Sequence, residues 1–241
     1  MEITDLHRRL ALLLDPEKCT TIDSVQRLVD GLLDQRLYVD GIYRGPAMIL
    51  VGGSTGTDSE WLVGQLKQNL SLPIILFPGN CNQFTPKADG ILYLSLLSGT
   101  NPEYLVGQQI RSARAIHDSG IQVIPTGYIL IDGGVETSTM RVTHTQPLDP
   151  NNVDAIVNTA IAAQLMGKHI VYLEAGSGAD NPVPESVITA VKEHVTIPLI
   201  VGGGIRTPEA MRKAYDAGAD IVVIGNHLEA HPDQLMQFCI L

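Results

Sequence analysis

A lone carboxylate stands between an apolar run and a loop of small residues near the middle of the chain. Residues 170–173 read Ile-Val-Tyr-Leu, which is typical of a buried parallel strand, and Glu174 follows them directly. The loop behind it reads Ala175, Gly176, Ser177 and Gly178. A buried acid at a strand end is costly unless it is paired or used. Glu174 is therefore a candidate general base, and a structural carboxylate in an ion pair is the alternative.

Glycine-rich turns close two later apolar runs. The turns read Gly202-Gly203-Gly204 after residues 199–201 and Gly225-Asn226 after residues 221–224. Because glycine lets a backbone approach an oxyanion closely and point N–H groups at it, these turns predict a phosphate site. The loop after Glu174 could add N–H and hydroxyl donors to the same anion. Tight turns that hold no ligand are the alternative.

Oxygen-bearing side chains also follow the first two apolar runs. Asp15 ends the first run and precedes Pro16, and Ser54 and Thr55 come at the end of the second. A carboxylate in this place suits Mg²⁺, which takes one or two protein carboxylates together with substrate phosphates. The Ser54 hydroxyl could join the same metal or donate to a diphosphate. The alternatives are a helix-capping role for Asp15 and a plain turn at Ser54.

Apolar runs alternate with helical patterns along most of the chain. The expected strands cover residues 10–14, 47–51, 73–77, 91–94, 121–124, 170–173, 199–201 and 221–224. The expected helices run from about 23 towards 36, over 58–69, from 102 to 120, over 153–166, 184–194 and 208–217, and from 228 onward. Eight such units predict a single-domain (β/α)8 barrel over residues 1–241, with the strand ends at one mouth. A doubly wound open sheet is the alternative, but no Gly-x-Gly-x-x-Gly follows the first strand.

Two stretches break this alternation. Residues 78–90 hold two prolines and no helical period, so a loop is expected where the third helix would lie. Residues 126–150 fit either a short hairpin or a mobile flap. In the helix after Pro102, three apolar positions share one face, the pattern of a helix that packs against a core: Val106, Ile110 and Ala113.

Composition limits the function classes. The 241 residues are 44% hydrophobic, and the net charge is -10 with no basic cluster, so a nucleic-acid partner is not expected. The N-terminal residues 1–9 lack a signal-peptide pattern, and no apolar run approaches the roughly 20 residues of a membrane span. A cytoplasmic protein is expected. The cysteines and histidines show no metal-ligand spacing, and the cysteines are expected to be reduced thiols.

Read together, these motifs resemble one family, the geranylgeranylglyceryl phosphate synthases or PcrB-like prenyltransferases, and within it the second group. The matching pieces are Leu14-Asp15-Pro16, Val51-Gly52-Gly53-Ser54-Thr55-Gly56, Phe77-Pro78-Gly79-Asn80, Ser95-Leu96-Leu97, Pro125-Thr126-Gly127-Tyr128, Tyr172-Leu173-Glu174-Ala175-Gly176-Ser177-Gly178, Val201-Gly202-Gly203-Gly204-Ile205-Arg206 and Gly225-Asn226. The run from Tyr172 is highly specific, whereas the glycine pairs alone are not. The link over residues 20–46 is longer than is usual in the family, and residues 132–147 differ from its common pattern.

The resemblance implies a barrel with a loop in place of the third helix. It also implies transfer of a prenyl group from geranylgeranyl diphosphate to the C3 hydroxyl of sn-glycerol 1-phosphate, in a homodimer or homohexamer. Asp15 and Ser54 would hold Mg²⁺ against the diphosphate, and Glu174 would take the hydroxyl proton. The residues implied to hold glycerol phosphate are Tyr172, Leu173, Glu174, Ala175, Gly176, Ser177, Gly178, Gly203, Gly204, Gly225 and Asn226.

A prenyl tail also needs an apolar groove. The residues expected to line it are Tyr93, Leu94, Leu96, Leu97, Tyr104 and Tyr128, although ordinary core packing accounts for most of them equally well. Two other functions fit a phosphate-binding barrel. One is a phosphosugar isomerase or lyase, which would need neither Asp15 with Mg²⁺ nor a long groove. The other is a phosphometabolite binder without catalysis.

Overall fold

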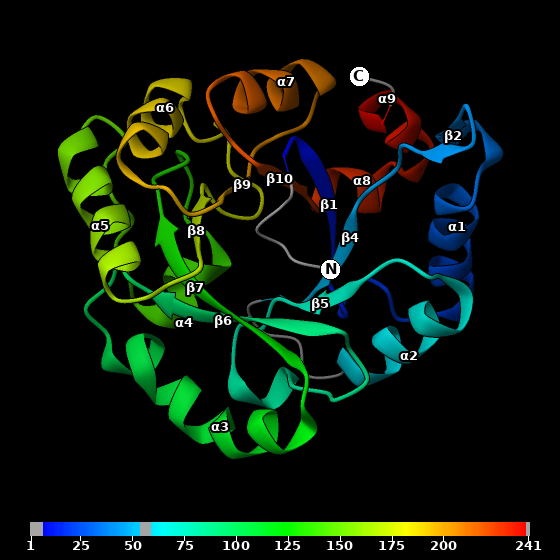
Figure 1. Ribbon diagram of the computed structural model, residues 1–241, viewed down its shortest axis with the longest axis horizontal. Coiled ribbons are helices and arrows are strands. Elements are labelled where there is room, and N and C mark those ends of the chain that lie inside the picture. Colours follow the sequence, from blue (N-terminus) through cyan, green and yellow to red (C-terminus); the bar gives the residue numbers. More distant parts are fainter. Residues whose placement is uncertain (1–6, 54–58, 240–241) are drawn as a thin grey trace.

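The computed structural model describes residues 7–53 and 59–239, which form a closed barrel of parallel strands ringed by helices (Figure 1). The strands are β1 (Arg9–Leu14), β4 (Met48–Val51), β5 (Ile74–Leu76), β6 (Gly90–Leu96), β7 (Gln122–Leu130), β8 (Ile170–Glu174), β9 (Leu199–Gly202) and β10 (Ile221–Ile224). Strand β1 closes the ring between β10 and β4. The (β/α)8 barrel expected from the sequence is confirmed.

Alternate side chains of the strands divide the apolar residues into two cores. Leu50 and Tyr172 belong to the core inside the barrel, whereas Val51 and Leu173 belong to the core between the strands and the helices. This division follows from the strand geometry, because successive side chains point to opposite faces. Glu174 lies two residues after Tyr172 and therefore projects on the inner side, at the carboxyl end of β8.

Helices surround the outside of the barrel (Figure 1). They are α1 (Ile22–Leu32), α2 (Ser59–Asn69), α3 (Gln108–Ser119), α5 (Val153–Leu165), α6 (Glu185–His194), α7 (Pro208–Asp216) and α9 (Leu235–Cys239). Two short helices, α4 (Ser138–Thr143) and α8 (Asn226–Ala230), lie instead at the barrel mouth. Among the described residues, no helix combines the length and the hydropathy that crossing a bilayer requires.

The connection between β5 and β6 is a loop, as the sequence predicts. Its described residues contain one short 3-10 turn, η3 (Cys81–Gln83), and no α-helix. The loop is held at two places. The Gln83 side-chain amide donates to the Gly53 carbonyl at 2.8 Å and accepts from the Gly79 N–H at 2.7 Å. The Cys81 N–H donates to the Gln108 side chain of α3 at 2.7 Å.

The long link between β1 and β4 departs from the expected single helix. Helix α1 ends at Leu32 instead of continuing towards residue 36, and the Asp34 carboxylate then accepts from the Arg36 N–H at 2.8 Å to cap a separate turn, η2 (Gln35–Leu37). A two-stranded hairpin of β2 (Tyr38–Val39) and β3 (Ile42–Tyr43) follows. The extra length of this link therefore forms an addition outside the barrel.

The stretch from 126 to 150 was predicted to form a short hairpin or a mobile flap, and the structure contains no hairpin there. Strand β7 continues to Leu130, and the chain then forms the short helix α4 before Leu148 bridges back to Ile131. The Thr137 hydroxyl caps α4 by accepting from the Met140 N–H at 3.3 Å. The hydroxyl of Tyr104 donates to the Val142 carbonyl at 3.2 Å, which fixes α4 over the barrel mouth.

Helix α3 presents the opposite face from the one its sequence suggests. It follows a π-helical turn, η4 (Glu103–Gly107), and the expected core positions Val106 and Ile110 are 50% and 69% exposed. Ala113 is also exposed, and Ile116 is the residue of α3 that is buried. The prediction of a packed face at these three positions is wrong. The final helix also begins at Asn226 rather than near Leu228, and α9 is separate from it.

Candidate active site

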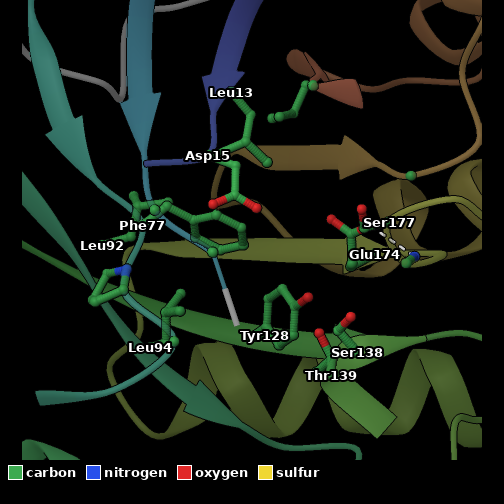
Figure 2. Close-up of a pocket in the computed structure, with 18 of the residues that line it drawn as sticks. Leu13, Asp15, Phe77, Leu92, Leu94, Tyr128, Ser138, Thr139, Glu174 and Ser177 are labelled. Carbon is green, nitrogen blue, oxygen red and sulfur yellow. Dashed lines mark hydrogen bonds between the residues drawn. The ribbon is translucent and has the colours of Figure 1, made fainter. Parts of the chain in front are cut away.

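A cavity of about 720 Å³ lies at the carboxyl ends of the strands. Its polar part is lined by Asp15, Lys18, Tyr172, Glu174, Gly176, Ser177, Gly178, Gly203, Gly204, Arg206, Gly225, Asn226 and Glu229. Its apolar part is lined by Leu13, Phe77, Phe84, Ile91, Leu92, Tyr93, Leu94, Leu96, Tyr104, Tyr128 and Val142. Figure 2 shows Asp15 and Phe77 between the apolar Leu92 and Leu94 on one side and Glu174 and Ser177 on the other. The predicted strand ends therefore meet around one space.

Glu174 is a buried carboxylate in the wall of this cavity. Its side chain is 6% exposed, and its Oε1 accepts from the Gly176 N–H at 2.7 Å. Burial raises the pKa of Glu174 from the ordinary 4.5 to about 7, and the Gly176 N–H and the nearby Tyr172 hydroxyl act in the opposite direction. Among the described residues, no cation pairs with Glu174, so nothing here supports a structural ion pair. A carboxylate with this pKa can accept a proton near neutral pH.

The Gly203 backbone lies against the Glu174 carboxylate. A Cβ atom added there would stand 2.5 Å from the Glu174 Oε1 and 2.6 Å from the Gly176 nitrogen, and the backbone has a φ of +83°. Both facts exclude a larger residue without a shift of the backbone. The glycines after β9 therefore let two strand-end loops approach each other across the mouth.

Backbone N–H groups without internal partners gather in the polar part. Within the described part of the chain, the N–H groups of Ser177, Gly178, Gly203 and Gly204 donate no hydrogen bond, and all four residues line the cavity. Gly203 and Gly204 are half-buried and Ser177 and Gly178 are exposed, so all four N–H groups are accessible to an anion that enters the cavity. Two other members of the predicted set lie elsewhere, because Leu173 and Ala175 pack in the outer core.

Arg206 holds the loop after β8 in place. Its guanidinium donates to the Ala179 carbonyl at 2.6 Å and to the Gly178 carbonyl at 3.4 Å. Since Arg206 comes two residues after Gly204, it ties the loop after β9 to the loop after β8. Sequence reasoning placed Arg206 in a motif but assigned it no role.

Asp15 offers oxygen ligands at the other side of the mouth. Its Oδ1 accepts from the Glu17 N–H at 3.0 Å, and a Cβ atom on Gly53 would stand 2.9 Å from that Oδ1 and 3.0 Å from the Oδ2. Glycine at 53 therefore leaves room beside the carboxylate. Ser54, the second predicted metal ligand, lies outside the described residues.

The side chains at this site fit Mg²⁺ only in the coordination that uses a single protein carboxylate. The described residues contain no group of three His, Cys, Asp or Glu side chains that could hold a metal. A cage built from protein alone is therefore not supported in that part of the chain. Mg²⁺ commonly uses one carboxylate and completes its shell with waters and substrate phosphates. Asp15 fits this coordination, because it lines the cavity and because Gly53 has no side chain that would crowd its carboxylate.

The apolar part contains five of the six residues predicted for a groove. Leu94, Leu96 and Tyr128 project from β6 and β7, and Tyr93 and Tyr104 complete the set. The sixth, Leu97, packs outside the barrel, and the Cδ1 of its side chain would stand 3.2 Å from a Cβ on Gly127. Its expected place in the groove is wrong, because Leu97 directly follows β6 and packs against the outer core.

Three aromatic rings form a cluster beside Glu174. Phe77 stacks on Tyr172 with centroids 5.2 Å apart and an interplanar angle of 15°, and Tyr128 meets Tyr172 edge to face at 5.4 Å. The Tyr172 hydroxyl is buried near the Glu174 carboxylate but makes no well-formed hydrogen bond to another described residue. An unpartnered buried hydroxyl at a cavity wall is available to a ligand.

Sequence reasoning missed two charged residues that line the polar part, Lys18 and Glu229. The Lys18 ammonium contacts the Asn226 side chain and lies 2.9 Å from the Glu229 Oε2. Each of these charged residues follows a predicted strand end by only a few positions. That position is the signal that could have identified them.

Comparison with known proteins identifies the family. The PcrB family model matches residues 3–240. The chain belongs to the PcrB family. A geranylgeranylglyceryl phosphate synthase of Zunongwangia profunda is 47% identical over 222 residues, which cover 91% of this chain and 90% of the relative. One of Flavobacterium johnsoniae is 47% identical over 223 residues, with 91% and 87% covered. The family expected from the motifs, and with it the expectation of an enzyme, is confirmed.

Solved structures agree with this PcrB-family assignment. The (S)-3-O-geranylgeranylglyceryl phosphate synthase of Thermoplasma acidophilum, solved in complex with sn-glycerol-1-phosphate, superposes with a TM-score of 0.86 at 33% identity. The match covers 97% of this chain and 92% of that one. A tryptophan synthase α-subunit of Pyrococcus furiosus reaches a TM-score of 0.59 at 15% identity, a likeness of fold alone.

Proposed function

We propose that this enzyme transfers a geranylgeranyl group from geranylgeranyl diphosphate to the C3 hydroxyl of sn-glycerol 1-phosphate, with Mg²⁺ as cofactor. The observation that carries the proposal is the position of Glu174. This buried carboxylate, with a pKa raised to about 7, lies in one cavity with unpaired N–H groups and an apolar groove. The named relatives and the glycerol phosphate complex of the Thermoplasma enzyme support the same reaction.

The acceptor phosphate would bind in the polar part of the cavity. The unpaired N–H groups of Gly203, Gly204, Ser177 and Gly178 supply donors without adding side-chain charge. Bound there, the glycerol would reach towards Glu174, which the Gly176 N–H holds in one orientation. Such orientation of a reacting hydroxyl can contribute several kcal/mol to catalysis.

The prenyl chain would lie in the apolar part, with its diphosphate towards Asp15. Mg²⁺, when bound at Asp15, would neutralise negative charge on the leaving diphosphate. Phe77 and Tyr128 line the same cavity as Asp15 and Glu174 (Figure 2). Aromatic faces stabilise nearby positive charge, so these rings would favour the charge that develops on the allylic carbon.

The proposed reaction replaces one carbon–oxygen bond at the prenyl C1 with another. The bond between the prenyl C1 and the diphosphate oxygen breaks, and the diphosphate leaves with the electron pair. The C3 oxygen of glycerol phosphate forms the new bond to C1, and its proton passes to Glu174. Because the electrophile is activated by loss of diphosphate, a base with a pKa near 7 is strong enough.

A label-transfer assay tests the function. Labelled sn-glycerol 1-phosphate is incubated with C15, C20 and C35 prenyl diphosphates, with and without Mg²⁺. We expect an organic-extractable product that requires Mg²⁺ and forms fastest with the C20 donor. No product from any donor, despite measurable glycerol phosphate binding, would contradict the proposal and favour a phosphosugar isomerase or lyase, or a binder without catalysis.

The pH dependence of the reaction follows from Glu174. Only the ionised carboxylate accepts a proton, so kcat/KM for glycerol phosphate is expected to rise with pH through about 7 and to level off above it. Initial rates at limiting acceptor, measured from about two units below to two units above this pKa, give the profile. A rate that does not change across that range would contradict the role of Glu174 as the base.

The close approach at Gly203 predicts a large effect of a single methyl group. Gly203→Ala would place a Cβ against the Glu174 Oε1 and the Gly176 nitrogen at a backbone φ of +83°. We expect the Kd for sn-glycerol 1-phosphate to rise by about tenfold or more, because the two loops must move apart. Calorimetry measures the Kd, and Gly64→Ala is the control, since its Cβ would meet nothing within 4 Å. Equal binding by both variants would contradict the prediction.

Self-association is proposed from the exposed face of η4 and α3. Val106, Ile110 and Ala113 share this face and are exposed, although their pattern is that of buried positions. We expect Ile110→Asp to shift a homodimer or homohexamer towards the monomer in analytical ultracentrifugation, because a charge on this face must be desolvated at an interface. The exposed polar Arg114→Gln serves as a control on the same helix. An oligomer that persists unchanged in Ile110→Asp would exclude this face.

A further inference from the structure

Glu229 of α8 is a nearly buried carboxylate for which the proposed reaction has no use. Its side chain is 6% exposed, and both oxygens accept hydrogen bonds at the barrel mouth. The Oε1 accepts from the Asp15 N–H at 2.6 Å, and the Oε2 accepts from the Lys18 ammonium at 2.9 Å. Burial of a carboxylate is costly unless such bonds compensate for it. Glu229 therefore holds Lys18 in one place although the lysine side chain is 46% exposed.

Lys18 in turn determines the orientation of the Asn226 side chain. Its ammonium also contacts the Asn226 Oδ1. An ammonium carries donors and no acceptor, so it can face the oxygen of the amide but not the nitrogen. The Asn226 Nδ2 consequently points the other way, where it donates to the Ser177 Oγ at 2.7 Å.

This arrangement decides what the Ser177 hydroxyl can do. Its oxygen accepts the Asn226 N–H, so its own hydrogen is not used in that bond. No other hydrogen bond of this hydroxyl is formed with a described residue. Ser177 lines the cavity beside the unpaired N–H groups of Gly178 and Gly203. The hydroxyl hydrogen is therefore available to an acceptor within the cavity, and a phosphate oxygen is an acceptor only.

We propose that Lys18 and Glu229 are positioning residues for the acceptor phosphate, because through Asn226 they preset the Ser177 hydroxyl as a hydrogen-bond donor to it. The inference rests on the proposed function, since it assigns the phosphate of sn-glycerol 1-phosphate to this side of the cavity. Without Lys18 the Asn226 amide can rotate, and the Ser177 hydroxyl then donates to the amide oxygen instead of to the ligand. Lys18 acts through the amide and not by direct contact with the ligand.

A double-mutant cycle tests whether Lys18 affects phosphate binding through the Ser177 hydroxyl. Calorimetric titration with sn-glycerol 1-phosphate, without Mg²⁺ or prenyl diphosphate, gives the Kd of wild type, Lys18→Met, Ser177→Ala and the double variant. We expect each single variant to raise the Kd by about tenfold or more, since each removes a hydrogen bond to a charged phosphate. The double variant should resemble Ser177→Ala within about twofold, because the two changes remove the same donor.

The controls distinguish the positioning role of Lys18 and Glu229 from a general loss of charge or of folding. Lys213→Met removes an exposed lysine 3.6 Å from the exposed Glu185, and it should leave the Kd unchanged. Glu229→Ala is the second, independent variant, and it should raise the Kd by about threefold or more, because Lys18 loses its carboxylate. Saturating glycerol phosphate should restore the kcat of Lys18→Met, since the change acts on binding of the acceptor. Thermal unfolding of each variant checks that it is folded.

The outcomes distinguish this inference from the function on which it rests. Additive effects of Lys18→Met and Ser177→Ala, in a wild type that binds glycerol phosphate, would overturn the positioning role and leave the proposed function in place. Unchanged Kd values for sn-glycerol 1-phosphate in both Lys18→Met and Glu229→Ala would also overturn the positioning role and leave the proposed function in place. A wild type that does not bind sn-glycerol 1-phosphate would overturn both.

Discussion

Glu174→Gln is expected to lower kcat by about 10²–10⁴-fold, because general base catalysis contributes a factor of that size. The amide keeps the shape of the carboxylate and can still accept from the Gly176 N–H, which lies 2.7 Å from the Oε1. The Kd for sn-glycerol 1-phosphate should therefore stay within about threefold of wild type. Label transfer measures kcat, and calorimetry measures the Kd. Turnover similar to wild type would remove Glu174 from the role of base.

The same variant should be more stable than wild type at pH 8. Burial raises the pKa of Glu174 from 4.5 to about 7, so the folded protein binds the proton more tightly than the unfolded chain. For an acid with a raised pKa, stability is lost as pH rises from about 4.5 to about 7 and stays lost above it. The glutamine carries no charge to desolvate and avoids this loss. The Tm of Glu174→Gln should therefore exceed that of wild type at pH 8 and approach it below pH 4.5.

Asp15→Asn should have the second large effect, and it acts through the metal. The amide keeps an oxygen that can accept from the Glu17 N–H, and the Asp15 N–H stays bound to Glu229, so the local backbone should be retained. It loses the negative charge that a hard cation requires. We expect half-maximal activity to need about tenfold more Mg²⁺ or more, and calorimetric binding of Mg²⁺ with inorganic diphosphate to weaken to the same extent.

The control for this experiment is an exposed acid away from the mouth. Asp30→Asn on α1 changes the net charge by the same amount, and Asp30 accepts only from Gln26 among the hydrogen bonds of the described residues. Its Mg²⁺ titration should match wild type. If Asp15→Asn also titrates like wild type, Asp15 is not a ligand of the metal.

The sequence by itself determined the architecture and most of the catalytic candidates. Short apolar runs such as β8, β9 and β10 are typical of strands that are buried on both faces, and their regular alternation with helices favours a parallel sheet. In a closed parallel barrel, all carboxyl ends lie at one mouth. Residues that directly follow strands, such as Asp15, Glu174 and Gly203, therefore had to meet, and this could be derived without coordinates.

The direction in which individual side chains point was harder to predict from the sequence than the order of strands and helices. Leu96 lines the cavity while its neighbour Leu97 packs outside, because one step along a strand reverses the face. The helical pattern of Val106 and Ile110 predicts a buried face correctly only if the helix turns that face to the barrel. A π-helical turn precedes α3, and these residues lie at the surface. Periodicity identifies an apolar face but not the surface that covers it.

Only the tertiary structure decided which polar groups are bonded to one another. Glu229 and Asp15 are more than two hundred positions apart, and so are Lys18 and Asn226, yet each pair is in hydrogen-bond contact. No local rule of sequence contains these pairings, because barrel closure between β1 and β10 brings them together. The same closure buries Glu174 and raises its pKa to about 7. The sequence thus determined which chemical groups reach the mouth, and their packing decided the protonation and orientation with which they meet a ligand.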